Sequence, residues 1–231
     1  MAARYALYFA PAEDTLLWRL GSAWLGRDAA SARVLPRPTV DGFSPERLEE
    51  LTASPRSYGL HATLKAPFAL RPSLTVEDLA GAVRSLAARH ACFALPRMEV
   101  GPLSDFIAVR TDSDCVALQA LADACVVELD GFREPAGEDD VARRRAAGLT
   151  SRQEELLTHF GYPFVLDQWR FHITLTGRLT PLDARRLRPW LSRHLADALA
   201  PVQRCENLCL FVQAASGADF RLLQRFPLNR H

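Results

Sequence analysis

The chain has 231 residues, of which 48% are apolar, and its formal net charge at pH 7 is +1. This length and apolar content are enough to bury a large core. The near-zero charge argues against a general attraction to long nucleic acid or to an anionic membrane, so any phosphate must be bound by a local cluster of cations.

The first residues and the cysteines bear on the compartment. Residues 1–11 contain no long apolar run and are followed at once by Glu13 and Asp14, so we expect neither a signal peptide nor a membrane span. The five cysteines are odd in number, lack a C-x-x-C pair and lie mostly in apolar patterns, as core thiols of a reducing cytoplasm do. They are Cys92, Cys115, Cys125, Cys205 and Cys209.

The N-terminal part is expected to contain a strand and two helices. Residues 4–9 are short and rich in aromatic side chains, as a strand is, and residues 12–25 carry apolar side chains at helical spacing. A loop with several prolines follows, and Pro45 suits the first turn of a short helix that ends near Leu51.

Residues 61–66, His-Ala-Thr-Leu-Lys-Ala, are expected to form the next strand. Because successive side chains of a strand point to opposite faces, His61, Thr63 and Lys65 share a polar face and the apolar residues face a core. Lys65 is the only lysine of the chain, and a compact ammonium group suits a phosphate oxygen. The alternative is that this single lysine is present by chance and has no role in binding.

Residues 76–129 are expected to hold two helices and two strands. Apolar spacing and early acidic residues predict a helix over Val76–His90. Strands are predicted over Cys92–Val100 and Phe106–Arg110, and an amphipathic helix over Cys115–Leu129. This order fits an antiparallel sheet with helices on one side, which is the α+β class.

Residues 130–150 interrupt the pattern with an acidic run, a basic run and no apolar period. Two interpretations stay open. Charge runs are usually solvated connectors, but such a segment can also be a mobile flap that brings Arg143 and Arg144 to an anion.

The first four residues of the strand 61–66 have the pattern His-x-Thr-Leu, and a second copy of this motif occurs at residues 172–175. The second copy follows a helix predicted over Ser151–Phe160 with Ser151 as its N-cap. A lone strand histidine is more often structural than catalytic, but the repeated motif in a chain with six histidines points to a site. The residues expected on its polar face are Arg170, His172, Thr174 and Thr176.

The elements after the two motifs follow one order. A helix over Leu182–Leu199 and strands over Arg204–Gln213 and Asp219–Phe226 follow the second motif, as a helix and two strands follow the first. We therefore expect a single bilobal α+β domain that arose by duplication, with two antiparallel sheets flanked by helices and a central cleft. Its lobes are expected around residues 1–130 and 150–231, joined by a flexible segment 130–150.

Two histidines that face each other across a cleft suit the cleavage of a phosphodiester. One imidazole accepts a proton from the attacking water or hydroxyl, and the other donates a proton to the departing oxygen. Threonine hydroxyls and a nearby cation can hold the non-bridging oxygens, and no metal is required.

Three alternatives stay open. A metal site would use His61 and His172, but zinc normally takes three or four protein ligands. An RNA-binding or RNA-end-processing protein would need a larger basic surface than the net charge indicates. A non-catalytic sensor of a phosphorylated metabolite would use the same residues as an enzyme.

At its two motifs the chain resembles the 2H phosphoesterases, whose hallmark is a pair of His-x-Thr strands about half a chain apart. The stretches 58–68 and 169–179, together with the N-terminus and residues 161–163, are similar to the DUF1045 branch, which is associated with phosphonate metabolism. The resemblance implies a bilobal fold and a cofactor-independent cyclic phosphodiesterase. It also implies that His61 and His172 are acid and base and that Thr63 and Thr174 bind the phosphate.

The expected partner is a small phosphorylated substrate, and a cyclic ribose phosphate fits the association with phosphonate breakdown. Lys65 is a further candidate for binding the phosphate. Secondary candidates for substrate contact are Tyr58, Arg133, Arg143, Arg144, Tyr162, Arg170 and Thr176. The remaining histidines, expected to be surface or structural residues, are His90, His159, His194 and His231.

Overall fold

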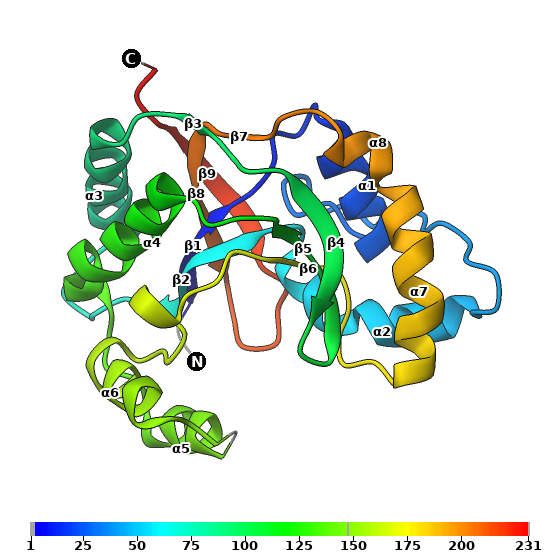
Figure 1. Ribbon diagram of the computed structural model, residues 1–231. Helices are drawn as coiled ribbons and strands as arrows, with labels where there is room; N and C mark the ends of the chain where they lie inside the picture. Colours follow the sequence, from blue (N-terminus) through cyan, green and yellow to red (C-terminus); the bar gives the residue numbers. More distant parts are fainter. Residues whose placement is uncertain (1–2, 147, 231) are drawn as a thin grey trace.

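The computed structural model describes residues 3–146 and 148–230. It has the predicted α+β class, with antiparallel sheets flanked by helices (Figure 1). The strands are β1 (Arg4–Phe9), β2 (Ala62–Ala69), β3 (Phe93–Ala94), β4 (Met98–Leu103), β5 (Phe106–Thr111), β6 (Ile173–Thr174), β7 (Arg204–Cys205), β8 (Asn207–Gln213) and β9 (Arg221–Pro227). The α-helices are α1 (Leu16–Leu25), α2 (Pro45–Tyr58), α3 (Val76–Arg89), α4 (Val116–Glu128), α5 (Glu138–Arg145), α6 (Ser151–Phe160), α7 (Pro181–His194) and α8 (Ala196–Leu199).

A four-stranded antiparallel sheet in the order β2-β1-β8-β9 lies at the centre of the molecule (Figure 1). Leu7 and Phe9 of β1 belong to the larger hydrophobic core, to which helices α3 and α4 also contribute. Ala6 and Tyr8 alternate with them and belong to a smaller core on the opposite face. The face that carries Tyr8 borders the cavity described below.

A second antiparallel sheet, in the order β4-β5-β6, holds the second motif. Its strand β6 has only two residues, which pair with Ala108 and Val109 of β5. Strands β2 and β6 are edge strands of their sheets and contact each other. The two motifs therefore meet where the two sheets adjoin.

Each sheet takes strands from both sides of residues 130–150, which differs from the expected division into sequential lobes. The C-terminal strands β8 and β9 join β1 and β2, and β6 joins β4 and β5. A β-strand pairs with whichever sheet edge lies beside it in space, whether or not the two segments are close in the sequence. N-terminal and C-terminal segments therefore share each sheet.

The described residues of the segment 130–150 include an α-helix as well as connecting chain. The helix α5 has three acidic residues in its first turn and three arginines in its last, a charge order that complements the helix dipole. None of its residues is buried, which explains why the sequence has no apolar period there.

The caps of two predicted helices differ from expectation, because a threonine caps each helix and moves the start of the first. The helix α1 begins at Leu16 rather than near Ala12, because the Thr15 hydroxyl accepts a hydrogen bond from the backbone N–H of Trp18. The helix α6 is capped in the same way by Thr150, not by the predicted Ser151.

Three predicted elements are each divided in two. The expected strand Cys92–Val100 becomes β3 and β4 on either side of Pro96, which has no N–H to donate to a sheet. The expected helix Leu182–Leu199 is divided into α7 and α8 at Leu195, and the expected strand Arg204–Gln213 into β7 and β8. Among the described residues, no helix is both long and apolar enough to cross a membrane.

Candidate active site

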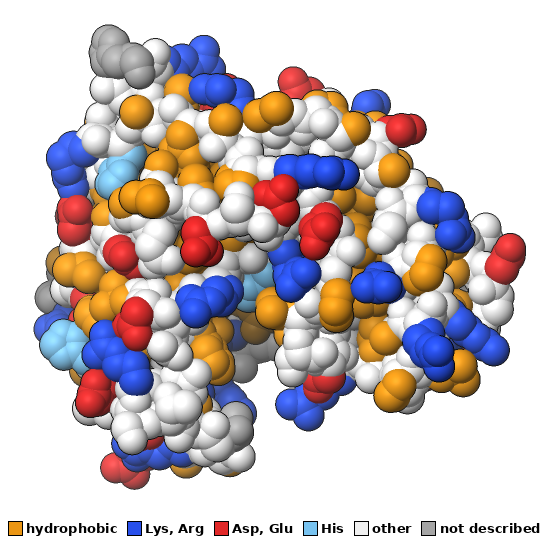
Figure 2. All heavy atoms as spheres, in the orientation of Figure 1, with side chains coloured by type: hydrophobic (Ala, Val, Ile, Leu, Met, Phe, Trp, Pro, Cys, Tyr) orange, Lys and Arg blue, Asp and Glu red, His pale blue; other side chains and the backbone are white. Residues whose placement is uncertain are grey.

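Both motifs line one cavity of about 370 Å³, which is within the range of roughly 300–1,000 Å³ for small-molecule sites. His61 and Thr63 reach it from the start of β2, and His172 and Thr174 from the segment that contains β6. Figure 2 shows the molecule hollowed at its lower edge, between the α5–α6 side and the β4–β5 hairpin. The other lining residues are Arg4, Tyr8, Ser54, Pro55, Tyr58, Ala66, Pro67, Arg143, Arg144 and Tyr162.

The two histidines are oriented by the same local hydrogen bond. Nδ1 of His61 lies 2.9 Å from the carbonyl oxygen of Gly59, and Nδ1 of His172 lies 2.8 Å from that of Arg170. A carbonyl oxygen only accepts, so Nδ1 carries a proton in both rings and Nε2 of each neutral ring keeps a lone pair. Nε2 of His61 also lies 3.3 Å from the Thr63 hydroxyl.

Gly59 turns the chain from α2 into the first motif. Its φ of 80° is in the region that favours glycine, and a Cβ there would lie 2.5 Å from the Cβ of Ala29. A glycine at this position therefore lets the chain turn tightly after Tyr58 and present its carbonyl to His61.

Burial keeps both imidazoles neutral in the free protein. The pKa of His61 is lowered from 6.5 to about 4: desolvation by burial has the largest effect, the hydrogen bond to Gly59 acts in the opposite direction, and the nearby His172 adds a smaller lowering. Desolvation also lowers the pKa of His172, which is less buried than His61. An anion bound between the rings would raise both pKa values.

Tyr8 is a site residue that the sequence motifs do not reveal. Its side chain is fully buried, and the centroid of its ring lies 3.9 Å from that of His61. Its hydroxyl has no hydrogen-bond partner among the described residues. Burial raises the pKa of this hydroxyl, so it stays neutral and can donate to a ligand in the cavity.

The structure brings several of the secondary candidates to the cavity. Tyr58 is the last residue of α2, which continues seven residues beyond its predicted end. Arg143 and Arg144 come from α5, and the guanidinium of Arg144 lies 4.8 Å from the ring centroid of Tyr162. This placement is the one expected of a segment that brings arginines to an anion.

Lys65 does not line this cavity, and its predicted place on the polar face is wrong. Thr63 pairs with Tyr8 and Lys65 pairs with Leu7, so two residues of β2 correspond to one residue of β1 and Leu64 forms a bulge. The bulge reverses the alternation, and Lys65 shares the face of Leu7. Its buried ammonium group donates to the carbonyl of Val126 and lies 3.6 Å from Asp130.

Arg133 also lies outside the cavity lined by the histidines. Its guanidinium donates to Asp130 at 2.8 Å and to the carbonyl of His159 at 3.0 Å. It borders a small separate cavity together with Lys65. The two cations thus share Asp130 and connect β2 to the start of the 130–150 segment.

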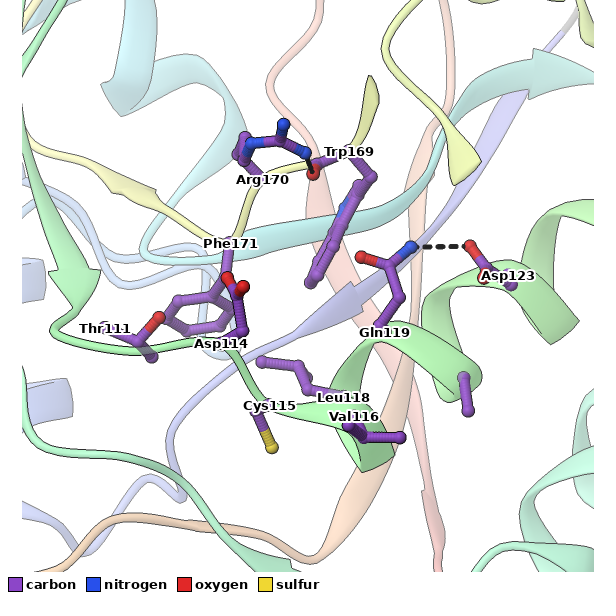
Figure 3. Close-up of a pocket in the computed structure, with 11 residues that line it drawn as sticks. Thr111, Asp114, Cys115, Val116, Leu118, Gln119, Asp123, Trp169, Arg170 and Phe171 are labelled. Atoms are coloured by element: carbon purple, nitrogen blue, oxygen red, sulfur yellow. Dashed lines mark hydrogen bonds between the residues drawn. The ribbon is translucent and has the colours of Figure 1, made fainter. Parts of the chain in front are cut away.

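Arg170 and Thr176 leave the polar face of the second motif because β6 is only two residues long. Arg170 donates to the backbone carbonyls of Asp167 and Trp169, and it lines a different cavity of about 570 Å³ (Figure 3). Thr176 is buried, and its hydroxyl accepts a hydrogen bond from the backbone N–H of Ile107. Strand alternation does not extend to either residue.

One hydrogen bond joins the two motif segments directly. The indole Nε1 of Trp169 donates to the carbonyl oxygen of Thr63 at 2.7 Å. This bond fixes the second motif against β2 three residues before His172.

The residues that the structure describes contain no group of three or more His, Cys, Asp or Glu side chains that could hold a metal ion. His90, His159 and His194 do not line the cavity, and His231 lies outside the described residues.

The sequence of the chain matches a family model described as "Protein of unknown function (DUF1045)" over residues 63–221. The chain belongs to the DUF1045 family. The resemblance to this branch that the two motifs indicated is therefore confirmed.

Two curated relatives of this DUF1045 protein are named ribose 1,5-bisphosphate phosphokinase PhnN. The relative from Janthinobacterium sp. (strain Marseille) is 38% identical over 230 residues, which are 98% of this chain and 51% of the relative. The relative from Laribacter hongkongensis (strain HLHK9) is 39% identical over 222 residues, which are 95% of this chain and 50% of the relative. The DUF1045 chain thus spans about half the length of the curated relatives it matches.

Weaker likeness is found among solved structures. E. coli LigT complexed with 3′-AMP is 14% identical, with a TM-score of 0.45 and coverage of 100% of both chains. A structure described as a phosphoesterase is 13% identical, with a TM-score of 0.41 and the same coverage.

Proposed function

We propose that this DUF1045 protein is a 2H-type phosphoesterase that hydrolyses a small cyclic phosphodiester without a metal ion. One observation carries the proposal: His61 and His172 line one cavity, each with Nδ1 bound to a carbonyl and each followed two residues later by a threonine at the same cavity. This leaves two Nε2 atoms, the atoms that general acid–base catalysis uses, in one enclosed space.

The proposed reaction needs one base and one acid. Water attacks phosphorus while Nε2 of one histidine accepts its proton, and the bond from phosphorus to the leaving oxygen breaks. The other histidine, protonated, donates its Nε2 proton to that oxygen, which gives a phosphate monoester and a free hydroxyl. Thr63 and Thr174 donate to the non-bridging oxygens, whose negative charge grows in the transition state.

Burial favours His61 as the base and His172 as the acid. His61 is the more deeply buried ring and its pKa is lowered to about 4, so its neutral form is the more strongly favoured. His172 lies closer to solvent, and the charge of a bound phosphate would raise its pKa and promote its protonation.

The relatives' name supports a ribose phosphate as the substrate class, because it refers to ribose 1,5-bisphosphate. We propose a cyclic ribose phosphate, in keeping with a role in phosphonate catabolism. The kinase activity in that name is not proposed for this chain, whose single lysine, Lys65, is not part of a G-x-x-x-x-G-K phosphate-binding loop. All five cysteines are free, which supports a cytoplasmic setting.

A substrate screen tests this function. Purified protein is incubated with 2′,3′-cyclic nucleotides, ribose 1,2-cyclic phosphates and RNA oligonucleotides with cyclic ends, with and without EDTA, and products are followed by ³¹P NMR. We expect hydrolysis of a small cyclic diester that EDTA does not reduce. Turnover that EDTA abolishes contradicts metal independence, preference for the oligonucleotides favours RNA-end processing, and binding without turnover favours a sensor.

A further inference from the structure

The cavity carries more positive charge than one phosphodiester requires. Three arginines line it, and the described residues around it include no Asp or Glu. A cyclic phosphodiester has a single negative charge, and the histidines and threonines of the two motifs already surround one phosphate position. The additional cations therefore suit a second anionic group.

Arg4 is one of these cations. It lies on β1 four residues before Tyr8 and hence on the same face of the strand. Its Nε donates to the neutral side chain of Gln213 at 2.7 Å, and its guanidinium lies 5.6 Å from the ring centroid of Phe220. These contacts orient the guanidinium without neutralising it.

Arg144 is held in a similar way. Its guanidinium lies over the ring of Tyr162, and its buried Nε has no hydrogen-bond partner among the described residues. In the described part of the chain neither Arg4 nor Arg144 forms an ion pair with a carboxylate, whereas Arg143 pairs with Asp140. A buried guanidinium nitrogen without a partner is costly unless a ligand satisfies it.

The two arginines come from elements on the same side of the molecule. Figure 1 shows the start of β1, near the N-terminus, and the helices α5 and α6 in the lower part of the view. Both arginines line the cavity of the histidines, so a ligand that fills it reaches the motif residues and the arginines together.

We infer that Arg4 and Arg144 form a second anion subsite, so that the substrate is a cyclic phosphodiester that also carries a separate phosphate monoester. The inference rests on the proposed function for the reaction at the histidines. Arginine suits this task because its planar fork of donors binds two phosphate oxygens at once.

A matched pair of probes tests the subsite. Ribose 1,2-cyclic phosphate is compared with the same compound carrying a 5-phosphate, and kcat/KM is measured for the wild type, Arg4→Gln and Arg144→Gln. We expect the wild type to prefer the 5-phosphorylated compound by about tenfold or more, as for charge-assisted hydrogen bonds. Each variant should lose most of this preference while its kcat/KM for the unphosphorylated compound stays within about threefold of wild type.

Two control variants sharpen the result. Arg152→Gln removes an exposed arginine of α6 that pairs with Asp167 and does not line the cavity, and it should leave the preference unchanged. Arg144→Lys keeps the charge and should restore part of the preference, because an ammonium group makes a single point contact. Higher ionic strength should weaken the preference of the wild type.

A binding measurement separates this inference from the proposed function. Ribose 1-phosphate and ribose 1,5-bisphosphate are titrated calorimetrically into the same variants, which needs no turnover. If neither cyclic compound is hydrolysed but the bisphosphate binds more tightly in an Arg4- and Arg144-dependent way, the subsite stands and the phosphoesterase proposal fails. The subsite is overturned if the wild type hydrolyses the cyclic compounds with and without the 5-phosphate equally well, or binds ribose 1-phosphate and ribose 1,5-bisphosphate equally tightly. It is also overturned if both Arg4→Gln and Arg144→Gln keep the wild-type preference for the 5-phosphorylated compound.

Discussion

His61 and His172 hold Nε2 toward one cavity in rings that burial keeps neutral, and this sets the expected pH dependence. The acid must be protonated, and desolvation lowers the pKa of His172 below 6.5 in the free protein, so kcat/KM should fall as pH rises above that pKa. On the acid side kcat/KM should fall as His61, with a pKa of about 4, takes up a proton. The predicted maximum of kcat/KM therefore lies below pH 6.5.

The profile of kcat should be displaced to higher pH than that of kcat/KM, because the bound phosphate raises the pKa of the neighbouring imidazolium. Steady-state kinetics over about pH 4 to 9 measure both profiles, whose apparent values belong to the coupled pair. A kcat/KM profile that is flat over this range, or that has its maximum above pH 8, is incompatible with the two-histidine account.

The hydroxyl of Tyr8 is expected to bind substrate. Because it has no partner in the free protein, Tyr8→Phe should leave the free energy of unfolding unchanged or slightly raised. It should lower kcat/KM by about ten- to a hundredfold, the range for losing a hydrogen bond to a charged group. Tyr5→Phe, on the opposite face of β1, is the matched control and should keep wild-type kinetics. Wild-type kinetics in Tyr8→Phe would mean that the hydroxyl serves only packing.

Residues two apart in a motif could be placed from the sequence, but residues on other strands could not. Alternation correctly puts each histidine with the threonine that follows it, because a two-residue repeat holds over so short a distance. Arg4 and Tyr8 share a face by the same rule, yet nothing local indicates that this face of β1 adjoins the motifs. Their role depends on tertiary pairing.

Within β2, the bulge at Leu64 decides which face Lys65 occupies. Sequence patterns gave no sign of it, because a bulge depends on how a strand pairs with its neighbour. Since Lys65 lies on the face of β2 away from the histidines, Lys65→Met should leave kcat/KM at pH 7 within about twofold of wild type. The substitution should change the free energy of unfolding instead. A large rise in KM without loss of stability would show that the ammonium group does reach the phosphate.

The contact between the two motif strands depends on Trp169. Replacing Trp169 by Phe keeps an aromatic ring but removes the hydrogen bond to the Thr63 carbonyl, which should lower the free energy of unfolding by about 1 kcal/mol. Loosened alignment of the two histidines should lower kcat by roughly tenfold. The matched control is Trp190→Phe on α7, away from the cavity. Equal kinetics for the two variants would exclude a positioning role.

The helix α5 shows the limit of periodicity at the scale of an element. Apolar spacing cannot detect a helix that buries no residue, so no helix was predicted over 138–145, although its acidic first turn and basic last turn complement the helix dipole. Helices that bury one face, such as α3 and α4, were predicted to within a few residues, whereas α2 continues seven residues beyond its predicted end.

For the whole molecule, the sequence indicated the α+β class and a shared site, but not how the strands are distributed between the sheets. The order of elements after each motif suggested two sequential lobes, whereas β8 and β9 return to pair with β1. Such pairing depends on long-range contacts, which element order alone does not specify. The contact between the edge strands β2 and β6 brings the two motifs to one cavity.

The central claim is that the two histidines act together on one phosphorus atom. It is tested most directly by kcat on the best cyclic diester, measured in EDTA for His61→Ala, His172→Ala, the double variant and the control His159→Ala. We predict that kcat falls by about 100- to 10,000-fold in each single histidine variant, and that the double variant is only slightly less active than the less active single variant. His159→Ala should keep wild-type kcat, and the circular dichroism spectra of all variants should match that of the wild type. Wild-type turnover in either His61→Ala or His172→Ala would contradict the shared acid–base mechanism.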